Sequence, residues 1–467
     1  MITHAGTPND AELIAIAWGW HWYWHVEPTA GSAMAVSEGV VTQASVPLVV
    51  RRNTLLLGAM QCISWVGIQA AATLNAIAAF ELTGDKTWAG LPVTAAIAGT
   101  AIAAPYAGRL MDRLGRRPVL LTGQVMDMLG CLTAGLSILY GSFGGLVASM
   151  LIRGAGTGTT ALSRLAAADM YPTAVRARGM SVVVTGGAIG AIAGPGLLNV
   201  VALWAKGTGA NTLALSWLAL SALSLVGVAA LALIRPDPRH IAANLADYYP
   251  DAVWAPKAVS DVGAQGAGAN AEAGFVASPV PRRYTLTAAI IAIALIQAGM
   301  VMVMVTAPLS MKLHGHEDAV YGVMTGHFAG MLGLSLFIGR LADRVGRRPV
   351  LASGALIFIA GAVTAPLFQD PLINGISLFL VGLGWCFCYV AANAIIADTT
   401  RPTERGRITG INDLMVSVCG AVASVVGGVL LSGAGYMTVG AVGIAIGLLP
   451  LLAALRLREG RPGHYVR

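Results

Sequence analysis

Side chains that bind soft metal ions recur at helical spacing in the second half of the chain. Met300 and Met304 are four residues apart in one apolar run, and His327 and Met331 are four residues apart in the next. Residues at i and i+4 share one face of an α-helix, so each pair forms a stripe of two donors. Thioether and imidazole donors suit Cu(I) better than they suit Mg, Ca or Mn. The spacing therefore predicts a copper site, provided that the two helices face each other.

Other interpretations of these side chains stay open. Methionine commonly fills irregular gaps in apolar cores, and this chain contains 17 of them. A histidine in the middle of an apolar helix needs a polar partner, so His327 could instead bind a proton or hydrogen-bond a substrate. His314 and His316 lie in a predicted loop, where they could gather metal or simply be solvated. Cys386 and Cys388 are soft donors as well, but residues at i and i+2 do not share a helical face.

The composition indicates what kind of element positions these side chains. Of the 467 residues, 56% are hydrophobic and only 11% are charged, whereas soluble domains carry about 25% charged residues. The 58 glycines favour close helix packing in lipid, where burial from water does not drive helix association. The net charge of +7 does not indicate a nucleic-acid partner, because the basic residues lie in short loops between apolar runs. The chain is therefore expected to lie in a lipid bilayer.

Apolar runs long enough to cross about 30 Å of hydrocarbon follow one another along the sequence. They predict an all-α polytopic membrane protein with twelve spans, six on each side of a polar linker rich in Gly, Ala and Pro. The predicted parts are an N-terminal segment at 1–53, a six-helix bundle at 54–234, the linker at 235–285, a second six-helix bundle at 286–456 and a tail at 457–467.

The distribution of Lys and Arg predicts the orientation in the membrane. If the first loop is outside, the outside loops carry only Lys86, Lys206 and Lys312, and the many arginines lie on the other side. Cytoplasmic loops are enriched in Lys and Arg, so both termini and the linker are expected in the cytoplasm of a bacterial cell. Residues 1–33 hold a Trp/His cluster, which we interpret as an over-extended start, with Met34 as the natural beginning. The alternatives are an interfacial aromatic belt and a metal-sensing arm, since His21 and His25 are spaced i, i+4.

A signature of glycine, aspartate and arginine occurs twice. Residues 108–119 read GRLMDRLGRRPV, and residues 339–350 read GRLADRVGRRPV, 231 positions later (339 − 108). A shorter match that begins at Asp169 and Asp398 has a separation of 229 positions (398 − 169). Two matches with nearly equal separations indicate an internal duplication.

The residue types in this signature have physical reasons. Glycine permits close helix contact, the carboxylate can pair with a guanidinium group or lie at a helix N-terminus, and arginine holds the loop at the anionic cytoplasmic surface. Arginines that only set the topology would not require glycine and aspartate at fixed spacing in both copies. The positions concerned are Gly108, Asp112, Arg116, Gly339, Asp343 and Arg347.

The first copy resembles the loop motif of the major facilitator superfamily, and the resemblance covers essentially the whole chain after residue 50. It implies two six-helix bundles related by pseudo-two-fold symmetry, and transport of a small solute by alternating access. It also implies that the signature acts as a conformational latch between the halves. We expect a monomer with no cofactor.

Two more segments resemble motifs of this superfamily. Arg153, followed by Gly-Ala-Gly-Thr-Gly, resembles a motif in which a membrane-buried arginine contributes to coupling. Asp127 is the one carboxylate predicted well inside hydrocarbon and is a second coupling candidate, with a helix-interface residue as the plainer interpretation. A third segment resembles an antiporter motif but lacks its closing glycine pair, so helix packing is an equal interpretation; it contains Gly186, Gly190, Gly194 and Pro195.

The paired Met and His residues resemble those of the CcoA-like copper importers within the superfamily. The resemblance implies that Met300, Met304, His327 and Met331 bind the metal. Because the same pattern also occurs in members of unknown substrate, it marks a subfamily. Copper uptake is one expectation for this chain.

The main alternative is proton-coupled efflux or uptake of a drug or small organic metabolite. That function favours an aromatic, apolar cavity with a carboxylate; the first predicted helix offers Gln61 and Gln69 but no acid before Glu81 at its end. A non-transporting membrane sensor is a remote alternative, because no added soluble output domain is expected. An enzyme is not expected, because the sequence has no P-loop, no HExxH and no paired carboxylates inside the apolar runs.

Overall fold

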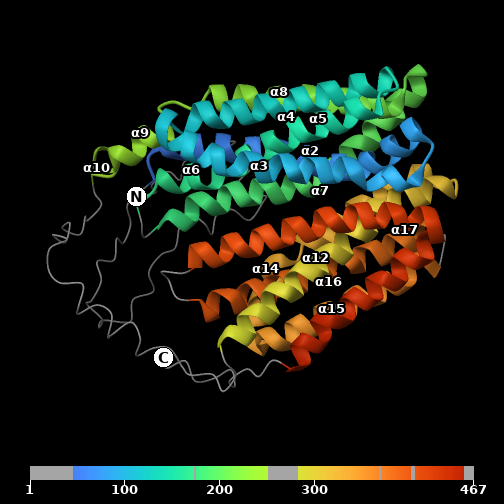
Figure 1. Ribbon diagram of the computed structural model, residues 1–467. Helices are drawn as coiled ribbons and strands as arrows, with labels where there is room; N and C mark the ends of the chain where they lie inside the picture. Colours follow the sequence, from blue (N-terminus) through green and yellow to red (C-terminus); the bar gives the residue numbers. More distant parts are fainter. Residues whose placement is uncertain (1–45, 173–174, 251–281, 368–369, 401–404, 457–467) are drawn as a thin grey trace, which may run out of the picture. The chain divides into compact units, whose positions relative to one another are not determined.

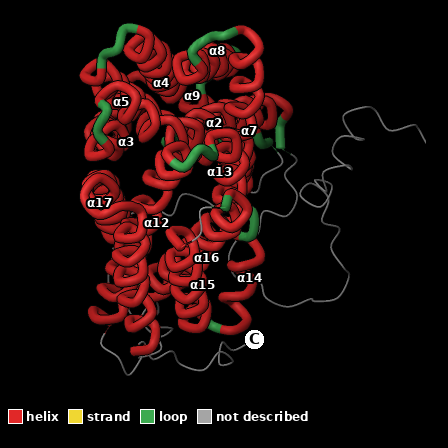
Figure 2. The backbone as a smooth tube through the Cα atoms, turned by 90° about the vertical axis from the view of Figure 1, so that its right-hand side faces the viewer, coloured by secondary structure: helices red, strands yellow, loops and turns green. Residues whose placement is uncertain are grey.

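The computed structural model describes residues 46–172, 175–250, 282–367, 370–400 and 405–456. The described residues form helices and short connections and contain no strand (Figure 2). All of the described helices belong to one compact unit, made of Gln43–Ala252 and Val259–Arg467. The predicted over-extended start, most of the linker and the C-terminal tail lie outside the described residues.

The helices of the N-terminal half run from the long first helix to two short helices at the start of the linker (Figure 1). They are α2 (Leu48–Thr83), the 3₁₀ helix η2 (Lys86–Gly90), α3 (Leu91–Leu114), α4 (Arg116–Leu139), α5 (Phe143–Thr160), α6 (Ser163–Asp169), α7 (Arg176–Thr208), α8 (Thr212–Ala232), α9 (Pro238–Ala243) and α10 (Leu245–Tyr248).

The C-terminal half repeats this order of long helices, with a bend in its second span and a break in its last helix. Its helices are α12 (Arg282–Leu313), α13 (Glu317–Leu332), α14 (Ser335–Val345), α15 (Arg347–Leu367), α16 (Pro371–Thr399) and α17 (Arg405–Arg456). Gly435 interrupts α17 with φ 75° and ψ 179°, so two helices follow each other there. An unbroken helix of 52 residues would be about 78 Å long, more than twice the hydrocarbon thickness.

Nine of the described helices are long and apolar enough to span a membrane, or ten if α13 and α14 form one bent span. Two features account for the difference from the twelve predicted spans. The last of the nine holds two helices separated at Gly435. In addition, α5 carries Arg153 and a tail of Gly and Thr, which lower its mean hydropathy. The first helix of each half begins a few residues before the predicted boundary, because a helix extends past its apolar stretch into the interface.

Packing in the N-terminal half depends on a row of glycines. Gly186 and Gly190 of α7 lie directly against the backbone of α2, and a Cβ atom at Gly190 would lie 2.0 Å from the carbonyl oxygen of Cys62. Gly194 makes the same kind of contact with Val66 one turn further along. The glycines of the antiporter-like segment therefore serve helix packing, as small residues do in membrane helices generally.

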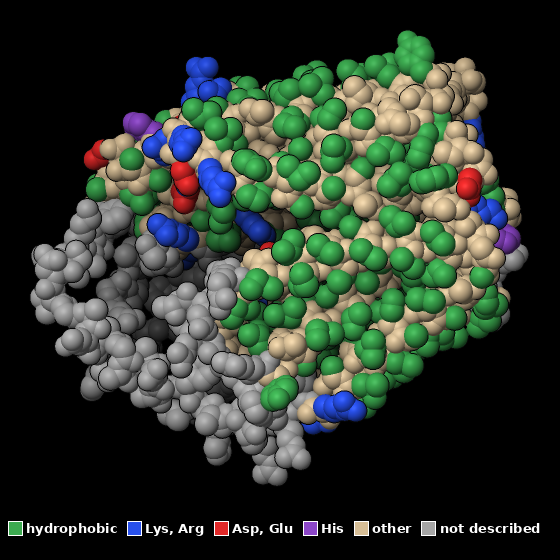
Figure 3. Space-filling model, viewed as in Figure 1, with side chains coloured by type: hydrophobic (Ala, Val, Ile, Leu, Met, Phe, Trp, Pro, Cys, Tyr) green, Lys and Arg blue, Asp and Glu red, His purple; other side chains and the backbone are tan. Residues whose placement is uncertain are grey.

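The lateral surface is apolar, as expected for a protein whose solvent is lipid. On the face shown in Figure 3, hydrophobic side chains cover the helices, and charged side chains gather toward the ends. Large apolar side chains such as Ile102, Leu203 and Phe337 are more than half exposed in the absence of lipid. An apolar surface of this extent indicates a membrane partner. The chain is an integral membrane protein.

Candidate functional site

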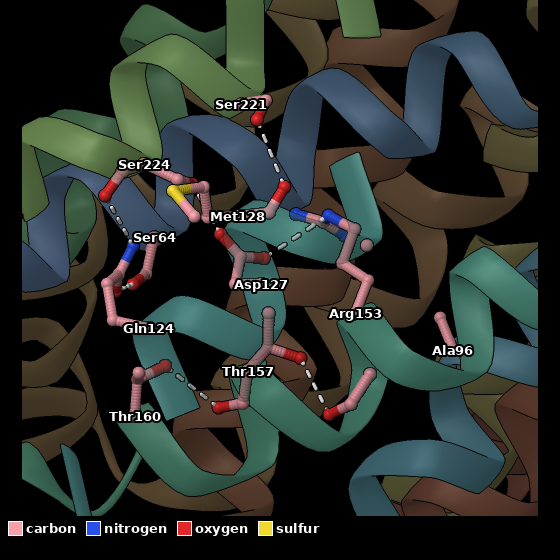
Figure 4. A network of polar contacts seen from close by, with 12 residues as sticks. Ser64, Ala96, Gln124, Asp127, Met128, Arg153, Thr157, Thr160, Ser221 and Ser224 are labelled. Carbon is pink, nitrogen blue, oxygen red and sulfur yellow. Dashed lines mark hydrogen bonds and ion pairs between the residues drawn. The ribbon is translucent and has the colours of Figure 1, made fainter. Parts of the chain in front are cut away.

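A buried ion pair joins α4 and α5 in the N-terminal half (Figure 4). Arg153 Nε lies 3.3 Å from Asp127 Oδ1, and neither side chain is more than 4% exposed. The two helices approach closely because glycines face the pair: a Cβ at Gly156 would lie 2.5 Å from the backbone nitrogen of Asp127, and one at Gly130 would lie 2.6 Å from Arg153 Cβ. The sequence singled out both charged residues separately, and the structure brings them together.

A polar chain connects this ion pair to two further helices. Ser224 of α8 donates a hydrogen bond to Asp127 Oδ2 at 2.6 Å. Gln124, one turn before Asp127, accepts a hydrogen bond of 3.0 Å from Ser64 of α2. Arg153 Nη2 has no hydrogen-bond partner among the described residues, and it lies against Gly67 of α2. A buried guanidinium group with an unused donor is costly, so its position facing α2 is a candidate functional feature.

His327 and Met331 of α13 lie together against α16 in the C-terminal half. A Cβ at Gly382 would be 3.2 Å from both His327 Nδ1 and Met331 Cγ. The imidazole is fully buried, and its Nδ1 lies 2.7 Å from the carbonyl oxygen of Leu378, which identifies Nδ1 as the protonated nitrogen. Its Nε2 has no partner among the described residues, so it is available as a ligand or acceptor.

Met300 and Met304 lie on a different helix, on a stripe whose third member, Gln297, contacts α16. Both are buried in α12, and Gln297 shares their stripe at i, i+3 and i+7. Gln297 Oε1 accepts a hydrogen bond of 2.7 Å from Trp385 of α16. Trp385 follows Gly382 by three residues, so Gln297 and the His327–Met331 pair contact neighbouring positions of one helix. That all four donors share a single point remains a prediction.

Other soft donors do not complete a metal site in the described part of the chain. The five cysteines are free thiols, and Cys388 points toward α15, where its Sγ lies 3.6 Å from the carbonyl oxygen of Leu351. No group of three or more His, Cys, Asp or Glu side chains within the described ranges has the arrangement of a metal site. A metal held here would depend on thioethers.

An aromatic pair next to Gln297 was not recognised in the sequence. Trp385 and Tyr389 stack with ring centroids 4.6 Å apart and an interplanar angle of 25°. Tyr389 is 36% exposed. The helical spacing of Trp385 and Tyr389 is the signal that could have revealed the pair.

The repeated signature builds the same ion-pair cluster in both halves. In the first half, Arg116 pairs with Asp112 at 2.8 Å and with Asp169 at 2.9 Å. In the second half, Arg347 pairs with Asp343 at 3.2 Å and with Asp398 at 3.1 Å. The duplicated sequence therefore forms duplicated contacts, and each of these clusters lies within its own half.

The close helix contact expected at the signature glycines is absent. A Cβ at Gly108 or at Gly339 would meet no described atom within 4 Å. The expectation was wrong for this conformation, because the described helices of the two halves do not touch at these two positions.

A carboxylate that the sequence analysis missed lies at the N-terminus of α4. Asp237, at the start of the linker, accepts hydrogen bonds from the backbone nitrogens of Arg116 at 3.1 Å and Arg117 at 2.9 Å. A carboxylate is stabilised there by the unpaired N–H groups and the helix dipole. Gly115 makes room for it, since a Cβ at that position would lie 2.9 Å from Asp237 Oδ2. The Pro-Asp-Pro run at 236–238 is the local signal.

The two halves are joined at the end that carries Lys86, Lys206 and Lys312, which we call the lysine end. Lys206 of α7 pairs with Asp318 of α13 at 2.5 Å, and Lys312 of α12 pairs with Glu81 of α2. Further along the same contact, Thr94 of α3 donates a hydrogen bond of 3.0 Å to the carbonyl oxygen of Ala421 in α17, and a Cβ at Gly90 would lie 1.8 Å from the carbonyl oxygen of Ser424. Backbone and ion pairs thus hold this end together.

The fold and its duplicated clusters agree with a comparison of the chain with protein families. The family model of the Major Facilitator Superfamily matches residues 55–262 and 287–466. The chain belongs to this superfamily. The relatives described next are transporters, and the resemblance to the superfamily drawn from the signature is confirmed.

Individual relatives in the superfamily cover nearly the same length. The chain is 30% identical over 411 residues to the uncharacterized MFS-type transporter YdeG of Bacillus subtilis (strain 168), covering 86% of this chain and 90% of YdeG. It is 27% identical over 412 residues to the riboflavin transporter RfnT of Brucella anthropi, covering 87% and 96% respectively. Among solved structures, the nucleoside transporter NupG has a TM-score of 0.64 at 14% identity, over 87% of this chain and 100% of NupG. That last likeness concerns the fold alone.

Proposed function

We propose that this protein is a secondary active transporter that moves a small organic solute across the cytoplasmic membrane by alternating access. The observation that carries the proposal is the stacked pair of Trp385 and Tyr389, with the amide of Gln297 hydrogen-bonded beside it. An aromatic platform with a neighbouring amide binds planar solutes by stacking and orients them by a hydrogen bond. The relative RfnT is a riboflavin transporter, and riboflavin is a planar heteroaromatic molecule, which supports a planar solute for this chain as well.

The proposed cycle assigns the present conformation to the inward-facing state. The positive-inside rule places the lysine end outside and both termini in the cytoplasm. Contacts between the halves gather at the lysine end, and Gly108 and Gly339 at the arginine-rich end meet no close neighbour. In the opposite state we expect the signature clusters to approach the other half, with Gly108 and Gly339 in close contact. The proposed latch role of Asp112, Arg116, Asp343 and Arg347 depends on their clusters contacting the other half in one state and not in the other.

We assign coupling to the Asp127–Arg153 pair. A carboxylate buried in a membrane domain is expensive when charged, and its arginine partner compensates for that cost. Protonation of Asp127 would leave Arg153 uncompensated and free to engage other groups near Gly67 of α2. Proton binding and the position of α2 would thereby become linked.

Copper uptake is a second candidate, favoured by one specific observation. His327 Nε2 is buried without a partner among the described residues and lies beside Met331, and Met300 and Met304 share a stripe of α12 with Gln297, which contacts α16. An unpaired imidazole nitrogen next to thioethers suits Cu(I).

Transport assays in proteoliposomes separate the two candidates. Tyr389→Leu should reduce uptake of a planar solute, with riboflavin as the first probe, by about tenfold, since Tyr389 is the exposed ring of the pair and base-like stacking on an aromatic ring contributes about 1–3 kcal/mol. The matched variant with Met300→Leu, Met304→Leu and Met331→Leu should retain that uptake, because this exchange nearly conserves volume. Copper uptake that is present in the wild type and absent from the methionine variant would instead establish the second candidate.

A further inference from the structure

A pocket of about 500 Å³ opens at the lysine end, away from the stacked aromatic pair. This volume lies within the range of small-molecule sites, about 300–1,000 Å³. Its wall comes from the ends of α12, α15 and α16 and from the break in α17, and η2 contributes one residue. The polar lining residues are Lys86, Ser310, His314, His316, Asn374 and Tyr436.

Lys86 is the one permanent charge among the residues that line this pocket, and no carboxylate lines it. Lys86 forms no ion pair with any described residue, in contrast to Lys312 nearby, which pairs with Glu81 and Glu317. An ammonium group facing a pocket without an acid creates a positive potential there. That charge favours an anion and disfavours a metal cation.

The neutral groups of the pocket add hydrogen-bonding capacity. The hydroxyl oxygen of Tyr436 is shielded from solvent and has no hydrogen-bond partner in the described part of the chain. Because it is shielded, this hydroxyl can donate to a ligand only after the side chain turns toward the pocket, and a ligand that then accepts its hydrogen bond gains affinity. His314 Nδ1 lies 2.7 Å from the carbonyl oxygen of Ser310, which fixes the ring orientation at the pocket wall. Met311, Leu431 and Met437 supply the apolar part of the lining.

We propose that this pocket binds an amphipathic anion, with a phosphate or carboxylate group on Lys86 and Tyr436 and a short apolar portion against Met311 and Leu431. Lys86 belongs to the N-terminal half, and the other lining residues belong to the C-terminal half. A bound anion therefore bridges the halves and stabilises their contact at the lysine end. The pocket thus regulates the conformational cycle, and this role is the same whichever solute the protein transports. The same chemistry is offered by a soluble organic anion and by an anionic lipid headgroup.

The test measures anion binding to the purified full-length protein. Butyl phosphate is titrated calorimetrically into the protein in detergent, and butanol serves as the neutral control. Lys86→Gln should weaken binding by about tenfold, equivalent to about 1.4 kcal/mol. Tyr436→Phe should weaken it several-fold, because only the hydroxyl is lost. Arg456→Gln removes an exposed positive charge that does not line the pocket, and it should leave the Kd unchanged.

A second arm identifies the source of the anion. Protein reconstituted in nanodiscs of phosphatidylglycerol or phosphatidylcholine is analysed by native mass spectrometry for retained lipid. Retention of phosphatidylglycerol by the wild type, and its loss in Lys86→Gln, supports the site with a lipid occupant even if butyl phosphate does not bind. Binding of butyl phosphate that Lys86→Gln leaves intact overturns the proposal. So does the absence of both butyl phosphate binding and phosphatidylglycerol retention.

Discussion

Asp127 and Arg153 illustrate what a single pair of residues contributes inside a membrane. Each would be costly alone, and they lie 3.3 Å apart with Ser224 on the second carboxylate oxygen. The sequence predicted that both are buried, because each interrupts an apolar run. It could not predict the pairing, because that depends on how α4 and α5 are aligned. The alignment follows from close contacts at Gly130 and Gly156, which are two glycines among 58.

Removal of one charge from this pair should be more harmful than removal of both. Asp127→Asn leaves a buried guanidinium group uncompensated, and breaking a buried pair in this way costs about 3–5 kcal/mol. We expect a clear fall in the thermal midpoint of the purified protein and loss of coupled uptake. Adding Arg153→Gln should restore much of the midpoint without restoring uptake. A single variant as stable as the wild type would show that the pair does not compensate a buried charge.

Helices follow from the sequence more reliably than the contacts between them. Lipid requires each span to satisfy its own backbone, so apolar runs predict the helices directly. The predicted count of twelve spans requires the two helices that Gly435 separates, whereas the bend between α13 and α14 was not predicted. The glycines of α7 were recognised by their spacing, but their partner helix was not, since spacing on one helix says nothing of the helix it meets.

The contact of α7 with α2 makes a prediction with a control on the same helix. Gly190→Ala places a Cβ atom 2.0 Å from the carbonyl oxygen of Cys62, which is backbone and cannot rotate away. The yield of monodisperse protein in size-exclusion chromatography should fall strongly. Gly196→Ala meets no atom within 4 Å, and alanine is the better helix former by about 1 kcal/mol, so that variant should be neutral or slightly stabilised. Equal yields from both variants would contradict the packing assigned to α7.

The whole molecule consists of two halves whose duplication was visible in the sequence. The ion-pair clusters around Arg116 and Arg347 match each other contact by contact, as the repeat predicted. Which end of the halves is joined could not be predicted, because the repeat describes both halves alike and carries no information about their relative tilt. The Trp385–Tyr389 pair was missed for a related reason: its proposed role depends on Gln297, which another helix contributes.

The latch proposal belongs to this scale, because it concerns the balance between two states. Asp112 and Asp343 are largely exposed, so Asp112→Asn and Asp343→Asn should each change stability by less than about 1 kcal/mol. Expression should stay near normal and transport should fall, because the loss of one charge shifts the equilibrium between the states. The assay is initial uptake normalised to the amount of protein in the membrane. Wild-type rates in both variants would remove the latch.

Alternating access is the central claim, and distances between spin labels at the two ends of the molecule test it most directly. One labelled pair replaces Arg113 and Arg344, exposed and equivalent positions of the two signatures, and the other replaces Thr87 and Ser432, which are hydrogen-bonded across the halves at 3.0 Å. In lipid nanodiscs we predict two distance populations for each pair. A shift of conditions that shortens the 113–344 distance should lengthen the 87–432 distance. A single, unchanging distance at both ends under every pH and solute condition would contradict the account.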